Sequence, residues 1–355
     1  MKFKGSQDAL LNLTRAFSAF SIAIWHFQLL IPMGNLNEIS IQDYPFPRVL
    51  GFLYTHGFLA VQLFWVISGF VISKAYMTKT WKPRSFLQNR FARLYPLHLL
   101  TLLIVATLQH AYRNLQGEYA ICEFQDTYHF LLNIFFIPAI GLEEGCSYNA
   151  PIWSVSVELI SYFAFAILLT LGGKITTTKL AIINCLTLIL LIFNPVNLPT
   201  HILECGFFFF AGVSLYALQS DSMKFPSYAI VFLLFFLLFK SVKIKLGTLE
   251  ITESSIPWVL FFGTILVLQD WVNKKLPIWK SLRKVSQRLG DLTYSSYLLQ
   301  YPLILIWLLV CRIFRINLEP SHLPLLLIGY ISSLFMLSYF TFQKFESYWR
   351  EKLRD

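Results

Sequence analysis

The chain has 355 residues, of which 56% are hydrophobic and only 14% are charged. A soluble globular domain carries about 25% charged residues, so this chain lacks the polar surface that solubility requires. The same composition excludes disordered, collagen-like and disulfide-scaffold proteins. The net charge of +10 gives no signal for nucleic acid, because the basic residues lie in short loops between apolar runs. We therefore predict an all-α integral membrane protein.

Ten apolar runs predict transmembrane helices, since a spanning helix needs about 20 residues and the flanks of a shorter run complete the crossing. An eleventh run, 128–141, is shorter and contains Pro138. Such a run predicts a re-entrant or interfacial segment rather than a crossing. The predicted spans are 11–31, 57–73, 94–112, 151–171, 180–194, 201–219, 225–240, 256–270, 292–311 and 322–343.

The charges of the loops predict the orientation. If the N-terminus is cytoplasmic and 128–141 does not cross, 22 of the 29 Lys and Arg residues face the cytoplasm and seven face outward. The positive-inside rule favours this arrangement, with both termini cytoplasmic. We expect no cleavable signal peptide, because the first apolar run contains Arg15. Residues 1–355 are thus predicted to form one multi-pass domain in the inner (plasma) membrane.

This orientation places residues 113–150 outside the cell. Cys122 and Cys146 share that segment. Two cysteines in one oxidising compartment suggest a disulfide, and two free thiols are the alternative.

The first predicted span carries two ionisable residues, Arg15 and His26. A charged group inside the bilayer costs about 2.5–3.5 kcal/mol, so its presence calls for a reason. In an ideal helix the two residues lie within about 20° of one face and about 16 Å apart. Alternatives are an Arg15 side chain that extends to the inner interface and a His26 that a neighbouring helix satisfies. Their shared face favours a functional role.

The span 151–171 carries Glu158 at a depth similar to that of His26, about 10 Å and about 8 Å below the outer boundary. A carboxylate beside an imidazole fixes its tautomer and raises its basicity, as base catalysis requires. We therefore hypothesise that His26 is a base paired with Glu158. A structural hydrogen bond from Glu158 to Ser154 or Tyr162 is the alternative.

Arg90 and Arg93 lie three residues apart at the start of the span 94–112, on its cytoplasmic side. That spacing places both guanidinium groups on one helix face, where they can clamp a phosphate. The other basic residues before them are adequately explained as orientation signals. The sequence shows no metal-ligand spacing, so we expect no metal.

Five motifs in order resemble the acyltransferase 3 family of integral-membrane O-acyltransferases. The first contains Arg15 and His26, the third contains Arg90 and Arg93, and the fourth contains Trp153 and Glu158. The motifs are LTRAFSAFSIAIWHF, GFLAVQLFWVISGFVIS, FLQNRFARLYPLHLL, APIWSVSVELISYF and LGDLTYSSYLLQYPLIL.

The resemblance implies an acyl-CoA donor, usually acetyl-CoA, and a carbohydrate hydroxyl acceptor in a surface polysaccharide or its lipid-linked precursor. It implies catalytic roles for Arg15, His26 and Glu158, and a substrate-binding role for Trp153. Arg90 and Arg93 would then hold the CoA phosphates. Two positions depart from the family pattern, Gln62 in place of an acidic residue and Gln300 in place of a histidine, so we predict no acid–base role for either.

Two mechanisms fit this pattern. His26 either deprotonates the acceptor hydroxyl or becomes acylated and relays the group; the matching depth of Glu158 favours the first. A transporter or flippase of a sugar or anionic metabolite is the alternative function, since charges inside the membrane suit it equally. An accessory membrane subunit without chemistry is a third reading.

Overall fold

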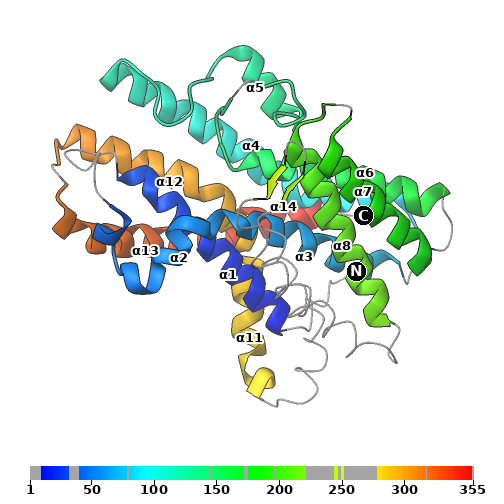
Figure 1. Cartoon of the computed structure of the whole chain (residues 1–355). Helices are drawn as coiled ribbons and strands as arrows, with labels where there is room; N and C mark the ends of the chain where they lie inside the picture. The colour runs from blue at the N-terminus through cyan, green and yellow to red at the C-terminus, as the bar shows by residue number, and fades with distance from the viewer. Residues whose placement is uncertain are drawn as a thin grey trace. The chain divides into compact units, whose positions relative to one another are not determined.

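The computed structural model describes residues 9–31, 40–77, 80–143, 145–171, 175–195, 197–220, 244–246, 249–251, 278–316 and 318–353 (Figure 1). The chain divides into two compact units. Unit 1 comprises Met1–Ala16, Leu59–Pro83 and Val157–Gly290, and unit 2 comprises Phe17–Phe58, Arg84–Ser156 and Asp291–Asp355.

In the described part of the chain, the regular elements are helices and one antiparallel hairpin, β1 (Ile244–Leu246) with β2 (Leu249–Ile251). The helices are α1 (Ala9–His26), η1 (Phe27–Leu30), η2 (Ile41–Asp43), α2 (Pro47–His56), η3 (Gly57–Leu59), α3 (Ala60–Tyr76), α4 (Pro83–Gln116), α5 (Thr127–Ile134), α6 (Ile152–Leu171), α7 (Thr177–Phe193), α8 (Thr200–Ser220), α11 (Ile278–Asp291), α12 (Thr293–Ile313), η4 (Pro320–His322), α13 (Leu323–Thr341), η5 (Phe342–Glu346) and α14 (Ser347–Lys352).

Six helical segments of the described chain are long and apolar enough to cross a membrane, and α7 is a shorter apolar helix. The six are Pro47–Tyr76, Pro83–Gln116, Ile152–Leu171, Thr200–Ala217, Thr293–Ile313 and Pro320–Lys352. Eight of the ten predicted spans coincide with described helices, and 225–240 and 256–270 lie outside the described residues. The helical membrane class is confirmed, while ten crossings and cytoplasmic termini stay predictions.

Unit 1 is organised by the close packing of α3 against α8, and α7 also packs against α8. Gly69 on α3 and Gly212 on α8 allow the two backbones to approach until neither position has room for a Cβ atom. Aromatic rings fill the space around this contact, including Phe165 and Tyr162 of α6 against Phe209 of α8.

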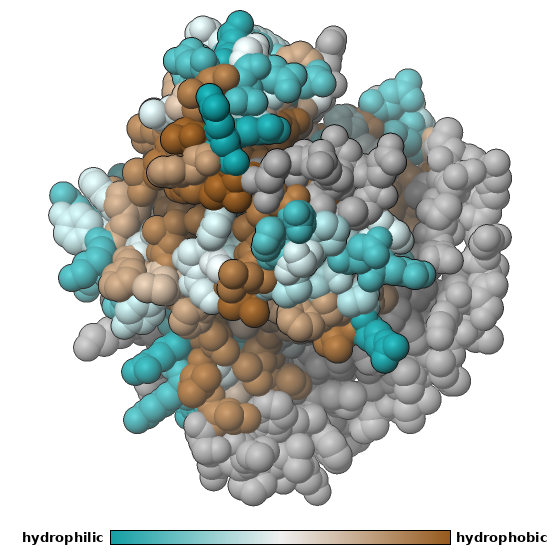
Figure 2. Space-filling model, turned by 90° about the vertical axis from the view of Figure 1, so that its left-hand side faces the viewer, coloured by the Kyte–Doolittle hydropathy of each residue, from teal (hydrophilic) through white to brown (hydrophobic). Residues whose placement is uncertain are grey.

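Unit 2 is organised around α12, which packs along α13 (Figure 1). Its core is a cluster of buried side chains that come mainly from α1, η1, α4, α12 and α13 and include Phe27, Leu102, Ile304 and Tyr330. Large apolar side chains elsewhere are exposed, among them Leu325 at 74%. Figure 2 shows apolar residues gathered over part of one face, among hydrophilic ones. A water-soluble surface rarely exposes so large an apolar area, whereas a lipid-facing one requires it.

The connection from α4 to α6, residues 117–151, contains the short helix α5 and is called the disulfide loop here because Cys122 and Cys146 are bonded in it, with their Cα atoms 5.0 Å apart. The eight residues of α5 are too few to span a bilayer. Its polar His129 and Asn133 are buried, whereas its apolar Tyr128 and Leu131 are exposed. The re-entrant or interfacial placement of 128–141 stays a prediction.

Candidate active site

His26 is the last residue of α1, at the point where the helix tightens into the 3₁₀ turn η1. Its Nδ1 atom lies 2.6 Å from Oε1 of Gln300 on α12. Gln300 is fully buried, and its Nε2 donates to the carbonyl oxygen of Ala19 on α1 at 3.4 Å. The Trp25 ring lies beside the imidazole, with the ring centroids 5.0 Å apart. The histidine singled out by the sequence is thus held from one side by α12.

Helix α12 also bonds to the other segments that the sequence singled out. The Tyr294 hydroxyl donates to the carbonyl oxygen of Leu94, next to Arg93 on α4, at 2.6 Å. The Tyr297 hydroxyl lies 3.1 Å from the carbonyl oxygen of Pro151 and 2.7 Å from Oγ of Ser154, at the start of α6. Three motifs far apart in the sequence therefore meet on one helix.

Two further contacts of α12 involve residues that the sequence did not single out. Asn149 is fully buried, and its Nδ2 donates to Thr101 Oγ1 at 2.9 Å and to the Leu298 carbonyl oxygen at 3.2 Å. Ser295 donates to the buried carboxylate of Glu346 at 2.6 Å. The sequence gives no signal for these positions, because Asn149 lies in a polar loop and Ser295 and Glu346 have polar neighbours in the sequence.

Glu158 of α6 accepts a hydrogen bond from the Tyr162 hydroxyl at 2.7 Å. The Ser68 hydroxyl of α3 lies 3.0 Å from the same phenol oxygen. Because the Tyr162 proton is directed to Glu158, Ser68 donates to Tyr162. Of the two structural bonds considered for Glu158, the one to Tyr162 is present. The pairing of Glu158 with His26 stays a prediction, and the structure instead gives each residue a partner of its own.

The remaining predicted site residues lie on α1, α4 and α6. Arg15 is half-buried on α1. Arg90 is buried, and its guanidinium carbon lies 5.9 Å from the centroid of the Phe86 ring, whereas Arg93 is half-buried. Trp153 stands in the first turn of α6 with 37% of its surface exposed. Arg15 and Glu158 belong to unit 1, and the others belong to unit 2.

The other departure from the family pattern, Gln62, has an acidic neighbour. Gln62 is buried on α3 and donates a side-chain hydrogen bond to Glu204 of α8. The carboxylate that the family often carries at the position of Gln62 is therefore absent, but a carboxylate of the facing helix lies against it.

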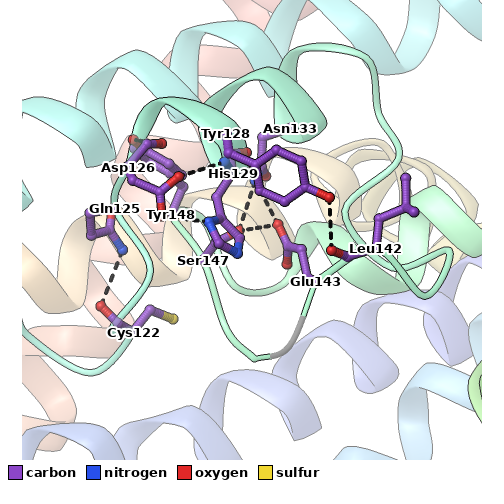
Figure 3. Close-up of polar contacts among 10 residues, drawn as sticks. All are labelled: Cys122, Gln125, Asp126, Tyr128, His129, Asn133, Leu142, Glu143, Ser147 and Tyr148. Atoms are coloured by element: carbon purple, nitrogen blue, oxygen red, sulfur yellow. Dashed lines mark hydrogen bonds and ion pairs between the residues drawn. The ribbon is translucent and has the colours of Figure 1, made fainter.

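The disulfide loop contains a separate polar cluster (Figure 3). The Asp126 carboxylate caps α5 and lies 2.7 Å from Nδ1 of His129, and the backbone hydrogen bond from His129 is the main cause that lowers the pKa of Asp126. Burial raises the pKa of Glu143, which accepts a 2.5 Å hydrogen bond from Ser147. Among the residues described, no three His, Cys, Asp or Glu side chains are grouped as metal ligands.

The apolar helices, with polar residues bonded between them, define a helical membrane protein. The family model of the acyltransferase 3 type, described as an acyltransferase domain, matches residues 8–342, so the chain belongs to this family. The matched region contains every motif from Arg15 to Gln300.

Two curated relatives are similar over part of the chain. "Protein 2 in picA locus" of Rhizobium radiobacter is 31% identical over 134 residues, which cover 31% of this chain and 64% of the relative. "Acyltransferase MdmB" of Streptomyces mycarofaciens is 32% identical over 128 residues, covering 36% of this chain and 32% of the relative. The chain thus spans less than two thirds of either relative. No solved structure matches it.

Proposed function

We propose that the protein transfers an acyl group, most favourably acetyl, from cytoplasmic acyl-CoA to a hydroxyl of a surface carbohydrate or of its lipid-linked precursor, in the inner membrane. The observation that carries the proposal is the junction on α12. There His26, the Leu94 segment beside Arg93, and Ser154 at the start of α6 are all bonded to residues of one helix.

The proposed step is direct transfer. His26 takes the proton from the acceptor O–H as the oxygen attacks the thioester carbonyl and a C–O bond forms. The C–S bond then breaks, and the CoA thiolate leaves and receives that proton from the imidazolium. Glu158 carries a negative charge that stabilises the imidazolium if it faces His26 in the working protein. In the second route His26 itself attacks the thioester and passes the acyl group on.

The donor is proposed to bind through basic side chains. Arg90 and Arg93 bind the CoA phosphates, since guanidinium groups make paired hydrogen bonds to phosphate oxygens. Arg15 is proposed to follow the thioester end, and Trp153, which is partly exposed, to contact the acceptor. The family membership and the relative named as an acyltransferase support the reaction class.

The test uses the purified full-length protein in nanodiscs with acetyl-CoA and a panel of sugar acceptors. Mass spectrometry follows free CoA and the acylated sugar. We expect transfer by the wild type and its loss in His26→Gln. CoA turnover that persists in His26→Gln would remove His26 from the mechanism. Sugar movement across the bilayer without any CoA turnover would establish the transporter instead. An acylated protein, trapped with donor but no acceptor, would select the relay.

A further inference from the structure

We infer that Gln300 is the positioning residue that holds His26 in the Nδ1–H tautomer and so makes Nε2 its reactive nitrogen. This inference rests on the proposed function and goes beyond it, because it assigns the proton of the imidazole and gives a role to a position where the family motif carries histidine.

The neighbours of Gln300 fix the orientation of its side-chain amide. Its Nε2 faces the carbonyl oxygen of Ala19, which can only accept a hydrogen bond, so the NH₂ group must be the one on that side. Its Oε1 therefore faces His26. The neighbours of Gln300 on α1 therefore distinguish its Oε1 atom from its Nε2 atom.

The contact with Gln300 also determines which ring nitrogen of His26 carries the proton. The amide oxygen of Gln300 has no hydrogen to give, so the 2.6 Å contact requires Nδ1 of His26 to be the donor. A neutral imidazole carries only one N–H, and its second nitrogen must then hold the lone pair. That nitrogen is Nε2, which is the atom able to take a proton from a hydroxyl or to attack a thioester.

A glutamine at position 300 differs from a glutamate in its charge. Gln300 is fully buried, and its amide accepts the same hydrogen bond that a carboxylate would accept without bringing a charge into the membrane. A glutamate here would hold the same tautomer but would also stabilise the imidazolium. Gln300 therefore orients the His26 base, and a negative charge that stabilises the imidazolium has to come from another residue.

The experiment compares Gln300→Met with Gln109→Met in the full-length protein. Gln109 is a similarly buried amide of unit 2, and both ends of its side chain are bonded to Ala120 and not to a predicted site residue. We expect kcat to fall about 10- to 100-fold in Gln300→Met, within the range that a positioned base contributes. The KM for acetyl-CoA should change less than about twofold, and Gln109→Met should keep the wild-type kcat. Equal kcat values in both variants would overturn the inference.

Gln300→Glu separates a positioning role from a structural one. Since the carboxylate retains the hydrogen bond, we expect this variant to keep more of the wild-type kcat than Gln300→Met does. Because it also stabilises the imidazolium, the acidic limb of the pH–rate profile should move to higher pH. An acidic limb that does not move would contradict the assignment.

A readout that needs no substrate keeps this inference separate from the proposed function. Nitrogen-15 spectra of histidine-labelled protein, with the His26 signals identified by their absence in His26→Gln, report which nitrogen carries the proton. We expect Nδ1–H in the wild type and a mixture of tautomers in Gln300→Met. A wild-type spectrum with the proton on Nε2 would overturn the inference even if transfer occurs. The expected spectrum without any transfer would reject only the proposed function.

Discussion

Gly69 of α3 and Gly212 of α8 each lie against the backbone of the other's helix, so neither position has room for a methyl group. A Cβ atom on Gly69 would overlap the carbonyl group of Phe209, and one on Gly212 would overlap that of Val66. Because the obstacle is backbone, a change of rotamer cannot relieve it. This contact fixes the separation of α3 and α8, the helices that carry Ser68 and Glu204.

We therefore expect Gly69→Ala and Gly212→Ala to destabilise the protein by at least about 1–3 kcal/mol, the usual cost of overpacking. Thermal unfolding in one detergent gives the comparison. The control is Gly206→Ala on the same helix α8, where an added Cβ meets nothing within 4 Å and where alanine favours the helix. Equal melting temperatures of Gly69→Ala and Gly206→Ala would contradict this prediction, because α3 and α8 would then accommodate the added methyl group without loss of stability.

The second prediction concerns the carboxylate of Glu158. Tyr162→Phe removes the hydroxyl that donates to it, and a hydrogen bond to a charged group is worth about 1.5–3 kcal/mol. If Glu158 acts in transfer, kcat of the folded variant should fall about 10- to 100-fold, in addition to the loss of thermal stability that the missing hydrogen bond causes. Tyr216→Phe is the matched control, a tyrosine of α8 whose ring packs against Phe70. Equal activity of the two variants would assign Tyr162 to packing only.

The third prediction concerns the disulfide between Cys122 and Cys146. The bond closes a segment with a sequence separation of 24, for which chain-entropy arguments give about 3 kcal/mol of stabilisation. Cys122→Ser should lower the melting temperature, and reductant should affect the wild type but not this variant. The exposed Cys185 supplies the control variant Cys185→Ser. Alkylation of both Cys122 and Cys146 in the non-reduced protein would contradict the bond.

The fourth prediction concerns the pH dependence of the disulfide loop. The pKa of Asp126 is lowered, mainly by the backbone hydrogen bond from His129, so its contribution to stability is present above the ordinary aspartate range. That contribution is lost as the pH falls through the lowered pKa. Asp126→Ala, which also removes the cap of α5, should cost about 1 kcal/mol at neutral pH. Melting temperatures of the wild type and the variant should converge in acid, and a constant difference would contradict the assignment.

The helices were largely predictable because lipid requires long apolar runs, whereas their ends were not. The run 94–112 gave a helix that in the structure begins at Pro83, eleven residues earlier. The added turns are polar and leave no hydropathy signal. Proline at the first position of a helix was the local cue, since its missing N–H costs nothing there.

Candidate residues for the site could be chosen from the sequence, and their roles stay predictions, but their contacts could not be predicted. The cost of charge in a bilayer singled out Arg15, His26 and Glu158. The structure bonds His26 to Gln300 and Glu158 to Tyr162, and that reasoning does not single out these two neutral residues. Gln300 was even set aside, because an amide cannot carry a proton in acid–base chemistry. Its proposed contribution is to orient the His26 imidazole through a hydrogen bond. Such a bond depends on which helices pack together, and the sequence does not show this.

The bond between Cys122 and Cys146 also bears on how the chain is threaded through the bilayer. Disulfides such as this one persist on the oxidising side of a membrane. Lysine and arginine residues, in contrast, concentrate in the loops on the cytoplasmic side. Sulfur chemistry and charge are unrelated physical principles, yet both lead us to expect the disulfide loop on the outer face. A reporter fused within this loop would therefore check two independent arguments in one measurement, and the redox state of a single cysteine pair serves as a built-in marker of sidedness.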